Sequence, residues 1–561
     1  LPGGERMRKP RRVEAFGWLL AIVLAWLVVY PIFLVLVESV RGPSGWTLEH
    51  VSRFLERGNT WEALWGSLWI SLVSVVLAGT LGVPLAFLFS WVDFPGRRVL
   101  SGLVALPAVL PPLVGVIAFM FLYGETGFVA HLVRAVFRLD RAPWRLEGAG
   151  AILLVHGYSM YVYFYLFIRA ALARLDSSML EAAASLGAGR TRTLFRVVLP
   201  MVRPALTGAA LLTFMTSLAS FSAPYIFGGG FRVMTTQIVT TRLNGDNGLA
   251  MVQTVSLALV ALVALWSFRG NVGGTGYTAQ AKGVAPKPRP IRGRRARVAM
   301  ATAAWAAAIV LLLPHATVIL VSLVPFGTWT TEAIPPAYTV QNYVALVTEP
   351  ERLRPLVNSV TMATVATALA VGLSVLAGVL AVRRKVRVGP MIEALMSLPW
   401  AVPGTVFAIA LATAFSISSP ATGRFLLVGT LWILPLAYLV RNLPITGRAI
   451  LAGFRQLDPA LEDAAATLGA GRWRTLRRVT LPLLRPALAA GATLAFVTAL
   501  GDFVTSIILY TYDTRPISME ILASLRDSDV GVAAAYGVFL MVLSAGVFVM
   551  GSESGTKGAG A

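Results

Sequence analysis

The side chains of this chain that could carry chemistry are few and scattered. Its 561 residues include four histidines, His50, His131, His156 and His315, and no cysteine. No HExxH or comparable spacing joins the histidines, and the chain has neither a GxxxxGK[ST] phosphate loop nor a Gly-Lys dipeptide. The sequence therefore predicts no metal site, no resident cofactor and no ATP-binding site of its own, and it argues against an enzyme.

Three polar residues stand inside strongly apolar stretches. We expect His156 to hydrogen bond to a neighbouring helix rather than to bind a ligand. Asp502, in "TALGDFVTS", is the most informative charge, because an aspartate at the centre of a membrane helix costs about 2.5–3.5 kcal/mol on insertion scales. Its repeat counterpart is Ser220, in "SLASFSAPY". We interpret Ser220 and Asp502 as candidate pathway residues; a hydrogen bond between helices is the alternative for Asp502.

A charged, glycine-punctuated segment occurs twice. Residues 181–200 read "EAAASLGAGRTRTLFRVVLP", and residues 463–482 read "DAAATLGAGRWRTLRRVTLP". Between residues 175–206 and 457–488, 21 of 32 positions are identical. A repeat of this length indicates two structural units of one design.

Each copy predicts a helix, a turn and a second, amphipathic helix. Asp176 and Asp458 are placed to cap the first helix, and the alanine runs favour it. A left-handed turn is expected at the glycines that follow, which are Gly187, Gly189, Gly469 and Gly471. Leu194, Val197 and Val198 then share one side, as in a segment at a membrane surface. We expect Pro200 and Pro482 to end these segments.

These segments must be held by membrane-spanning helices. Hydrophobic residues make up 57% of the chain and charged residues 13%, whereas a soluble protein is about one quarter charged. A helix needs roughly 20 apolar residues to cross a membrane. We predict twelve spans, at residues 16–37, 67–91, 101–123, 150–171, 204–227, 248–267, 299–325, 358–382, 391–415, 425–445, 486–510 and 531–551.

The basic residues indicate an orientation. Lysine and arginine total 48 against 26 acids, for a net charge of +22. Most of them fall in loops that lie on one side of the membrane if both termini are cytoplasmic, as the positive-inside rule requires. We therefore assign the excess charge to orientation and to contact with membrane lipid, and not to nucleic acid.

The spans divide into two halves of six. "LPAVLPPLVGVIA" and "LPWAVPGTVFAIA" form a second repeated pair. Because six is even, the repeats are parallel. We predict a first half at residues 1–268, a basic Gly/Pro-rich cytoplasmic linker at 269–297 and a second half at 298–561. The fold class expected is an all-α integral membrane protein.

The repeated segment resembles the EAA loop of type I binding-protein-dependent ABC importer permeases, with Glu-Ala-Ala, a glycine six residues after the Glu and an aliphatic-x-Leu-Pro ending. The first copy matches at Glu181, Ala182, Ala183, Gly187, Val197, Leu199 and Pro200. The second copy matches at Asp463, Ala464, Ala465, Gly469, Val479, Leu481 and Pro482. Asp463 replaces the family's glutamate, so the two copies need not make the same contact.

The resemblance implies a function. In that family the short helix couples to a cytoplasmic ATP-binding-cassette ATPase, here one copy per half, and an extracytoplasmic substrate-binding protein selects the cargo. The implied fold is the type I ABC permease fold, in the cytoplasmic membrane of a bacterium or archaeon.

The cargo is less defined than the role. The fused halves, "FGGGFRVMTTQI" and "GDFVTSIILYTYDTRPISMEI", look like the ferric-iron branch, with thiamine, polyamine and phosphonate permeases as alternatives. An ion-coupled secondary transporter is the competing class, and the scarcity of paired acids inside the spans speaks against it.

Overall fold

The computed structural model describes residues 11–43, 45–272, 288–290, 293–329, 334–416 and 420–557. Most of these residues are helical, which confirms the all-α prediction. The strands in the described ranges form two pairs of two residues each, β1 with β2 antiparallel and β3 with β4 parallel. Much of the predicted linker, 269–297, lies outside the described residues.

Two compact units make up the described chain. The first gathers residues up to Val51, Val344–Ser524 and the chain from Phe539 onward. The second gathers Ser52–Tyr343 and Leu525–Val538.

The helices and strands up to residue 343 are α1 (Arg11–Ser39), β1 (Arg41–Gly42), β2 (Gly45–Trp46), α2 (Glu49–Glu56), α3 (Gly58–Trp91), β3 (Val92–Asp93), α4 (Arg97–Leu103), η1 (Leu106–Val109), α5 (Pro112–Tyr123), α6 (Phe128–Phe137), α7 (Gly148–Leu172), α8 (Ser177–Ser185), α9 (Arg190–Thr193), η2 (Leu194–Val198), α10 (Leu199–Leu218), α11 (Ser222–Phe227), α12 (Met234–Leu243), α13 (Asn247–Val272), β4 (Arg289–Pro290) and α14 (Arg294–Val321). The later elements are α15 (Gln341–Thr348), α16 (Pro350–Ala377), η3 (Gly378–Arg383), α17 (Gly389–Ser397), η4 (Leu398–Ala401), α18 (Gly404–Phe415), η5 (Pro420–Thr422), α19 (Ile433–Gln456), α20 (Ala460–Thr467), α21 (Arg472–Thr475), η6 (Leu476–Thr480), α22 (Leu481–Leu483), α23 (Arg485–Leu500), α24 (Val504–Leu509), α25 (Ile517–Arg526) and α26 (Val530–Lys557).

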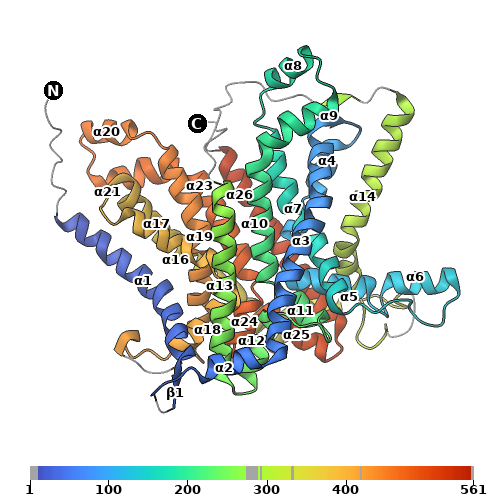
Figure 1. The fold of residues 1–561 in the computed structure, drawn as a ribbon, viewed down its shortest axis with the longest axis horizontal. Coiled ribbons are helices and arrows are strands. Elements are labelled where there is room, and N and C mark those ends of the chain that lie inside the picture. Colours follow the sequence, from blue (N-terminus) through green and yellow to red (C-terminus); the bar gives the residue numbers. More distant parts are fainter. Residues whose placement is uncertain are drawn as a thin grey trace. The chain divides into compact units, whose positions relative to one another are not determined.

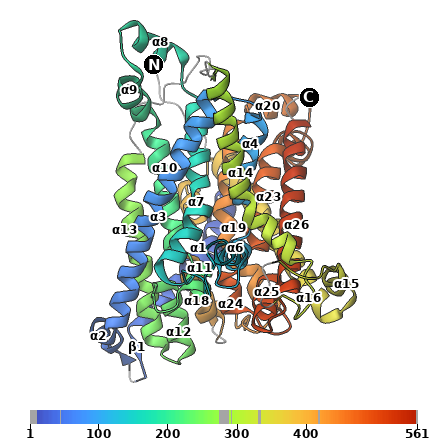
Figure 2. The ribbon, with the colours of Figure 1, turned by 90° about the vertical axis from the view of Figure 1, so that its right-hand side faces the viewer.

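The second unit is a bundle built around α3, α7 and α10. These helices run alongside one another, with α8 at one end and α2 and α12 at the other (Figures 1 and 2). α3 and α7 approach closely at Gly82, where an added Cβ would lie 2.3 Å from the carbonyl oxygen of Tyr161. Small residues at such contacts let membrane helices pack by van der Waals contact.

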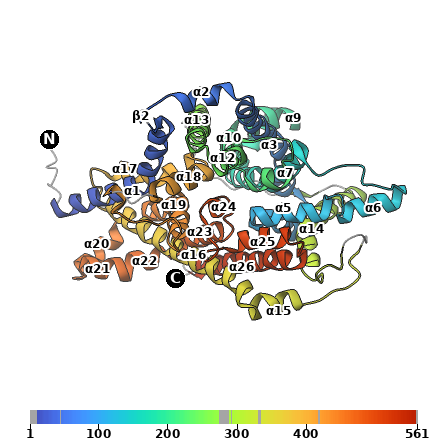
Figure 3. The same ribbon diagram turned by 90° about the horizontal axis from the view of Figure 1, so that it is seen from below.

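The first unit is built in the same way around α16, α19 and α23, which all contact one another. It also contains α1, which packs against α17 and α18 (Figure 3). Glu14 in α1 accepts a hydrogen bond from the backbone N–H of Arg387 at 3.1 Å, and the rings of Trp26 and Phe415 meet edge to face with centroids 5.7 Å apart.

Packing therefore crosses the repeats in both units. α1 belongs to the first half of the sequence but packs with helices of the second half, and α14 belongs to the second half but packs against α4 and α5. The boundaries at 268 and 298 remain a prediction that rests on the sequence repeat. The two compact units of the structure have other boundaries.

Some of the twelve predicted spans are not continuous helices. Among the described residues nine helices are long and apolar enough to cross a membrane, or eleven if two bent pairs each count as one span. α17 with η4 meets α18 at 109°, and the helix ending at Leu483 meets α23 at 70°. The predicted span 425–445 corresponds to α19, which is not among these candidate spans and which contains Arg441 and Arg448.

The predicted span 101–123 is also interrupted. α4, η1 and α5 replace one continuous helix, and the candidate span at this place is Pro112–Phe137. Proline lacks a backbone N–H and its ring clashes with the preceding turn of a helix, which accounts for the break at Pro107 and Pro111.

Candidate functional site: the two glycine-punctuated loops

We call residues 175–198 the first loop and residues 457–480 the second loop. The first loop contains α8, α9 and η2, and it lies at the end of its unit opposite α12 (Figure 2). The second loop contains α20, α21 and η6. Both predictions of a short helix, a turn and a second helix are confirmed.

The local sequence explains the first helix of each loop. The Asp176 carboxylate accepts a hydrogen bond from the backbone N–H of Ser178 at 3.0 Å. The Asp458 carboxylate accepts one from the backbone N–H of Ala460 at 2.9 Å. These contacts satisfy donors that have no partner in the first turn of a helix.

A left-handed glycine ends each of these helices. Gly187 has φ +75° and Gly469 has φ +80°, a conformation that costs a residue with a side chain roughly 1 kcal/mol. The next glycines, Gly189 and Gly471, have φ −66° and −65° and begin α9 and α21. The prediction of a left-handed turn therefore holds for the first glycine of each pair and was wrong for the second.

The predicted coupling residues mostly face outward. Exposed positions are Glu181, Ala182, Gly187, Asp463, Ala464 and Gly469, whereas Ala183 is buried and Ala465 is half-buried. In the described part of the chain the carboxylates of Glu181 and Asp463 have no hydrogen-bond or ion-pair partner.

A leucine before the left-handed glycine projects from each loop. Leu186 is 87% exposed and Leu468 is 88% exposed. Trp473 on the second loop and Phe195 on the first are also exposed. Each loop thus presents an acid and large apolar side chains, a combination suited to a protein partner.

The prolines do not end these segments. η2 is a π-helical turn in which the backbone N–H of Leu199 bonds to the carbonyl of Leu194, and the helix continues into α10. The widened turn accommodates Pro200, whose ring would clash in a regular helix. Arg190–Leu218 is accordingly one candidate span.

The second loop follows the same course as far as Pro482 in α22, and then it differs. The helix bends by 70° at Leu484 before α23.

Asp502 lies in a break between α23 and α24, 4% exposed. Its carboxylate forms an ion pair with Arg441 of α19 and accepts a hydrogen bond at 2.8 Å from the backbone N–H of Thr505, in the first turn of α24. Arg441 also donates to the hydroxyl of Thr505 at 3.1 Å. Asp502 is thus an inter-helix partner; a pathway role stays a prediction.

Ser220 lies at the corresponding break between α10 and α11. Its hydroxyl is 2.9 Å from His156 Nε2 in α7, while His156 Nδ1 is 2.9 Å from the Ser74 hydroxyl and 3.1 Å from that of Ser217. The prediction that His156 bonds to a neighbouring helix is confirmed. Each break is therefore joined to the helix at the fourth predicted span of its half, α7 or α19. Hydroxyl and imidazole groups make the contact in the first half, and an ion pair makes it in the second.

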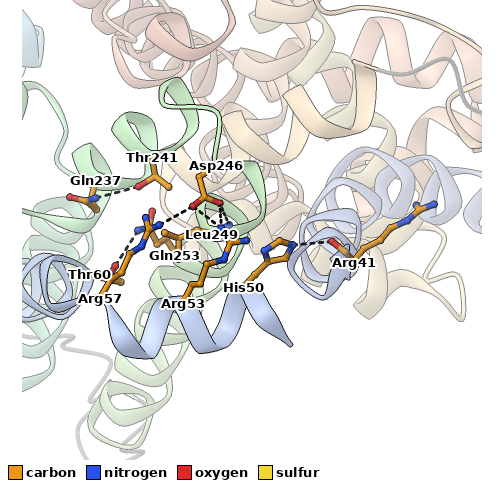
Figure 4. A network of polar contacts seen from close by, with 10 residues as sticks. All are labelled: Arg41, His50, Arg53, Arg57, Thr60, Gln237, Thr241, Asp246, Leu249 and Gln253. Carbon is orange, nitrogen blue, oxygen red and sulfur yellow. Dashed lines mark hydrogen bonds and ion pairs between the residues drawn. The ribbon is translucent and has the colours of Figure 1, made fainter. Parts of the chain in front are cut away.

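Another polar network lies at the far end of the second unit. The Asp246 carboxylate forms ion pairs with Arg53 at 3.1 Å and Arg57 at 3.5 Å, and it accepts a hydrogen bond from the backbone N–H of Leu249 (Figure 4). These contacts fasten α2 to the start of α13. Within the described residues no group of three or more His, Cys, Asp or Glu side chains is placed to hold a metal ion.

Sequence reasoning missed four residues that the structure brings into play. They are Arg441, the partner of Asp502, Glu462 in the second loop, and Arg383 and Thr480, which both contact Glu462. The signal for Arg441 was an arginine inside a predicted span, because such a charge needs a partner.

The described structure is that of an α-helical membrane protein with two exposed loops of one design. Residues 78–271 and 370–551 both match the family of binding-protein-dependent transport system inner membrane components. The chain belongs to this family and carries its domain twice. It is therefore a multi-pass inner-membrane protein and the permease component of an ABC importer.

Two relatives align with nearly the whole chain, and a third aligns with part of it. The chain is 29% identical over 548 residues to the probable ABC transporter permease protein y4fN of Sinorhizobium fredii, covering 96% of each. It is 27% identical over 545 residues to the ferric transport system permease protein FbpB of Actinobacillus pleuropneumoniae, covering 94% of this chain and 76% of the relative. It is 31% identical over 217 residues to the molybdenum transport system permease protein ModB of Escherichia coli, covering 37% of this chain and 91% of the relative.

Proposed function

We propose that this chain forms the translocation path of an ATP-driven importer for ferric iron, with hydrolysis on a separate ATPase subunit. Each loop docks one copy of that ATPase, and an extracytoplasmic binding protein delivers the cargo. Both termini and both loops lie on the cytoplasmic side.

The exposed acid of each loop is the observation that carries the coupling role. Glu181 and Asp463 project without a partner in the described chain, beside Leu186 and Leu468. A protein partner that covers these four side chains would explain why two acids and two leucines are exposed in this way. If the ATPase binds two arrangements of the loops with different affinity, its binding shifts the populations of those arrangements. In this way hydrolysis would move the helices.

The coverage of the relatives supports ferric iron. The ferric permease relative aligns with 94% of this chain, whereas the molybdenum relative aligns with 37% and a spermidine/putrescine relative with 44%. Molybdate, sulfate, polyamine, thiamine and phosphonate are the alternatives for the same role. Ser220 and Asp502 are the pathway residues under this proposal, because each sits where a span is broken.

Uptake in cells with and without this chain tests the cargo. Loss of the chain should abolish the binding-protein-dependent uptake of radioactive ferric iron and leave uptake of molybdate, sulfate and spermidine unchanged. Loss of one of the other uptakes, with ferric iron unaffected, would overturn the assignment of ferric iron.

The coupling role is tested with Glu181→Ala combined with Asp463→Ala. We expect the double variant to insert normally and to lose ATP-driven uptake or the co-purifying ATPase. Asp140→Ala removes an exposed acid outside the loops and should transport normally. Unchanged uptake in the double variant would contradict the role of the acids, and transport driven by a proton gradient without an ATPase would favour the secondary-transporter alternative.

A further inference from the structure

Arg383 joins the second loop to the end of the long helix formed by α16 and η3. Its Nη2 donates to the carbonyl oxygen of Leu457 at 2.9 Å, where α19 ends. Its Nε lies 3.3 Å from Oε1 of Glu462 in α20, and its guanidinium lies over the ring of Phe454, 5.9 Å from the ring centre. The Arg383 side chain is 12% exposed and that of Glu462 is 25% exposed, so water screens these charges only partly.

Glu462 extends this connection to the far end of the loop. The same carboxylate oxygen accepts a hydrogen bond from the Thr480 hydroxyl at 2.9 Å, and Thr480 is a buried residue at the end of η6. The beginning, middle and end of the second loop are thus tied to one guanidinium. The hydrogen bonds of Arg383 to Leu457 and of Thr480 to Glu462 are charge-assisted, and such bonds are directional and about twice as strong as neutral ones.

Among the residues that the structure describes, no ion pair or hydrogen bond between side chains holds the first loop in this way. At the positions that correspond to these three polar residues, the first half has Trp91, Leu180 and Val198. All three belong to one apolar cluster, in which Val198 is fully buried and the other two are partly buried. Apolar contacts are not directional, so they fix the angle of the first loop less strictly.

We propose that Arg383 and Glu462 are positioning residues that hold the second loop to the end of α16 by charge, while apolar packing alone holds the first loop. The second loop then moves as one body with α16 and α19. The first loop can shift on its apolar support. In the importer this makes the two docking loops mechanically unequal, a consequence that rests on the proposed function.

Hydrogen exchange measured on the full-length chain tests the proposal, because the two loops serve as matched probes in one sample. Glu462→Gln is nearly isosteric and removes the charge. We expect amide exchange in residues 457–480 to speed up about tenfold or more, as for the loss of a charge-assisted hydrogen bond, with exchange in residues 175–198 unchanged.

Two further variants complete the test. Arg383→Gln should give the same result as Glu462→Gln, and Thr480→Val, which keeps the ion pair, should have a smaller effect. Glu349→Gln removes an ion pair with Arg352 at the opposite end of α16 and should leave both loops unchanged. If Arg383→Gln does not insert, Glu462→Gln carries the test alone.

Unchanged exchange at α20 in Glu462→Gln would overturn the proposal, and so would equal acceleration in both loops, which would indicate general loosening. With the ATPase bound, we expect Glu462→Gln to lower the cargo moved per ATP hydrolysed. Faster exchange without that loss would support the positioning role and overturn its link to coupling. Exchange and transport therefore separate a failure of the positioning role from a failure of the proposed function.

Discussion

Removing the Asp502 carboxylate should destabilise the second-half bundle more than removing any exposed acid. Its side chain is 4% exposed and Arg441 is 28% exposed, so the pair is largely dehydrated, and breaking such a pair from one side costs about 3–5 kcal/mol. Asp502→Ala also leaves the buried N–H of Thr505 without its acceptor. We expect a loss of about 3–4 kcal/mol for Asp502→Ala and about 2 kcal/mol for Asp502→Asn, which keeps an acceptor for that N–H.

Equilibrium unfolding in mixed micelles, followed by tryptophan fluorescence, gives the differences in free energy of unfolding. The matched control is Asp513→Asn, because the ion pair of Asp513 with Arg354 is exposed and should be worth about 0–1 kcal/mol. Combining Asp502→Ala with Arg441→Ala should cost less than the sum of the single changes by about 1–3 kcal/mol. Additive effects, or a loss no larger than in the control, would refute the ion pair as a stabilising contact.

Three smaller perturbations follow from the packing. Gly82→Ala should destabilise by about 2 kcal/mol or more because its Cβ would lie 2.3 Å from a backbone oxygen of α7, whereas Gly79→Ala, with its nearest neighbour at 3.5 Å, should be neutral in the same unfolding assay. Gly187→Ala should speed amide exchange in α8, because a side chain at a φ of +75° costs about 1 kcal/mol. Gly189→Ala should leave this exchange unchanged, because Gly189 has a φ of −66°, which alanine adopts without strain. His156→Leu should cost about 1–3 kcal/mol because it removes the hydrogen bonds of the imidazole to the hydroxyls of Ser74, Ser217 and Ser220; stability equal to wild type would contradict this.

Local chemistry made the two loops predictable from the sequence. The capping aspartates and the left-handed glycines act through contacts within a few residues, so spacing alone identifies them. The course after Pro200 was not predictable in the same way. A proline is a strong signal to end a helix, and the sequence does not reveal the π-helical turn that lets the helix continue past it, which occurs in both loops.

The contacts that the sequence did not predict were mainly those between residues far apart in the chain. Asp502 was recognisable as a group that needs a partner, but Arg441 lies in another helix and no spacing rule joins the two. Arg383 was counted among the basic residues that set orientation, a property that does not distinguish an exposed arginine from one that holds a loop. α1 packs against α17 and α18 of the second half. Hydropathy shows that α1 is apolar, but it does not show which of the two similar halves α1 packs against.

The position of α1 has a consequence for how the chain is made. Its partners α17 and α18 begin at Gly389 and Gly404, so the ribosome must add more than 350 residues after α1 before the partner surface exists. At roughly 5–20 residues per second, this wait lasts on the order of 20–75 seconds. During that time α1 must remain in lipid without its protein neighbours. Among the candidate spans of the described chain α1 is the most hydrophobic, which suits a helix that inserts early and finds its place late.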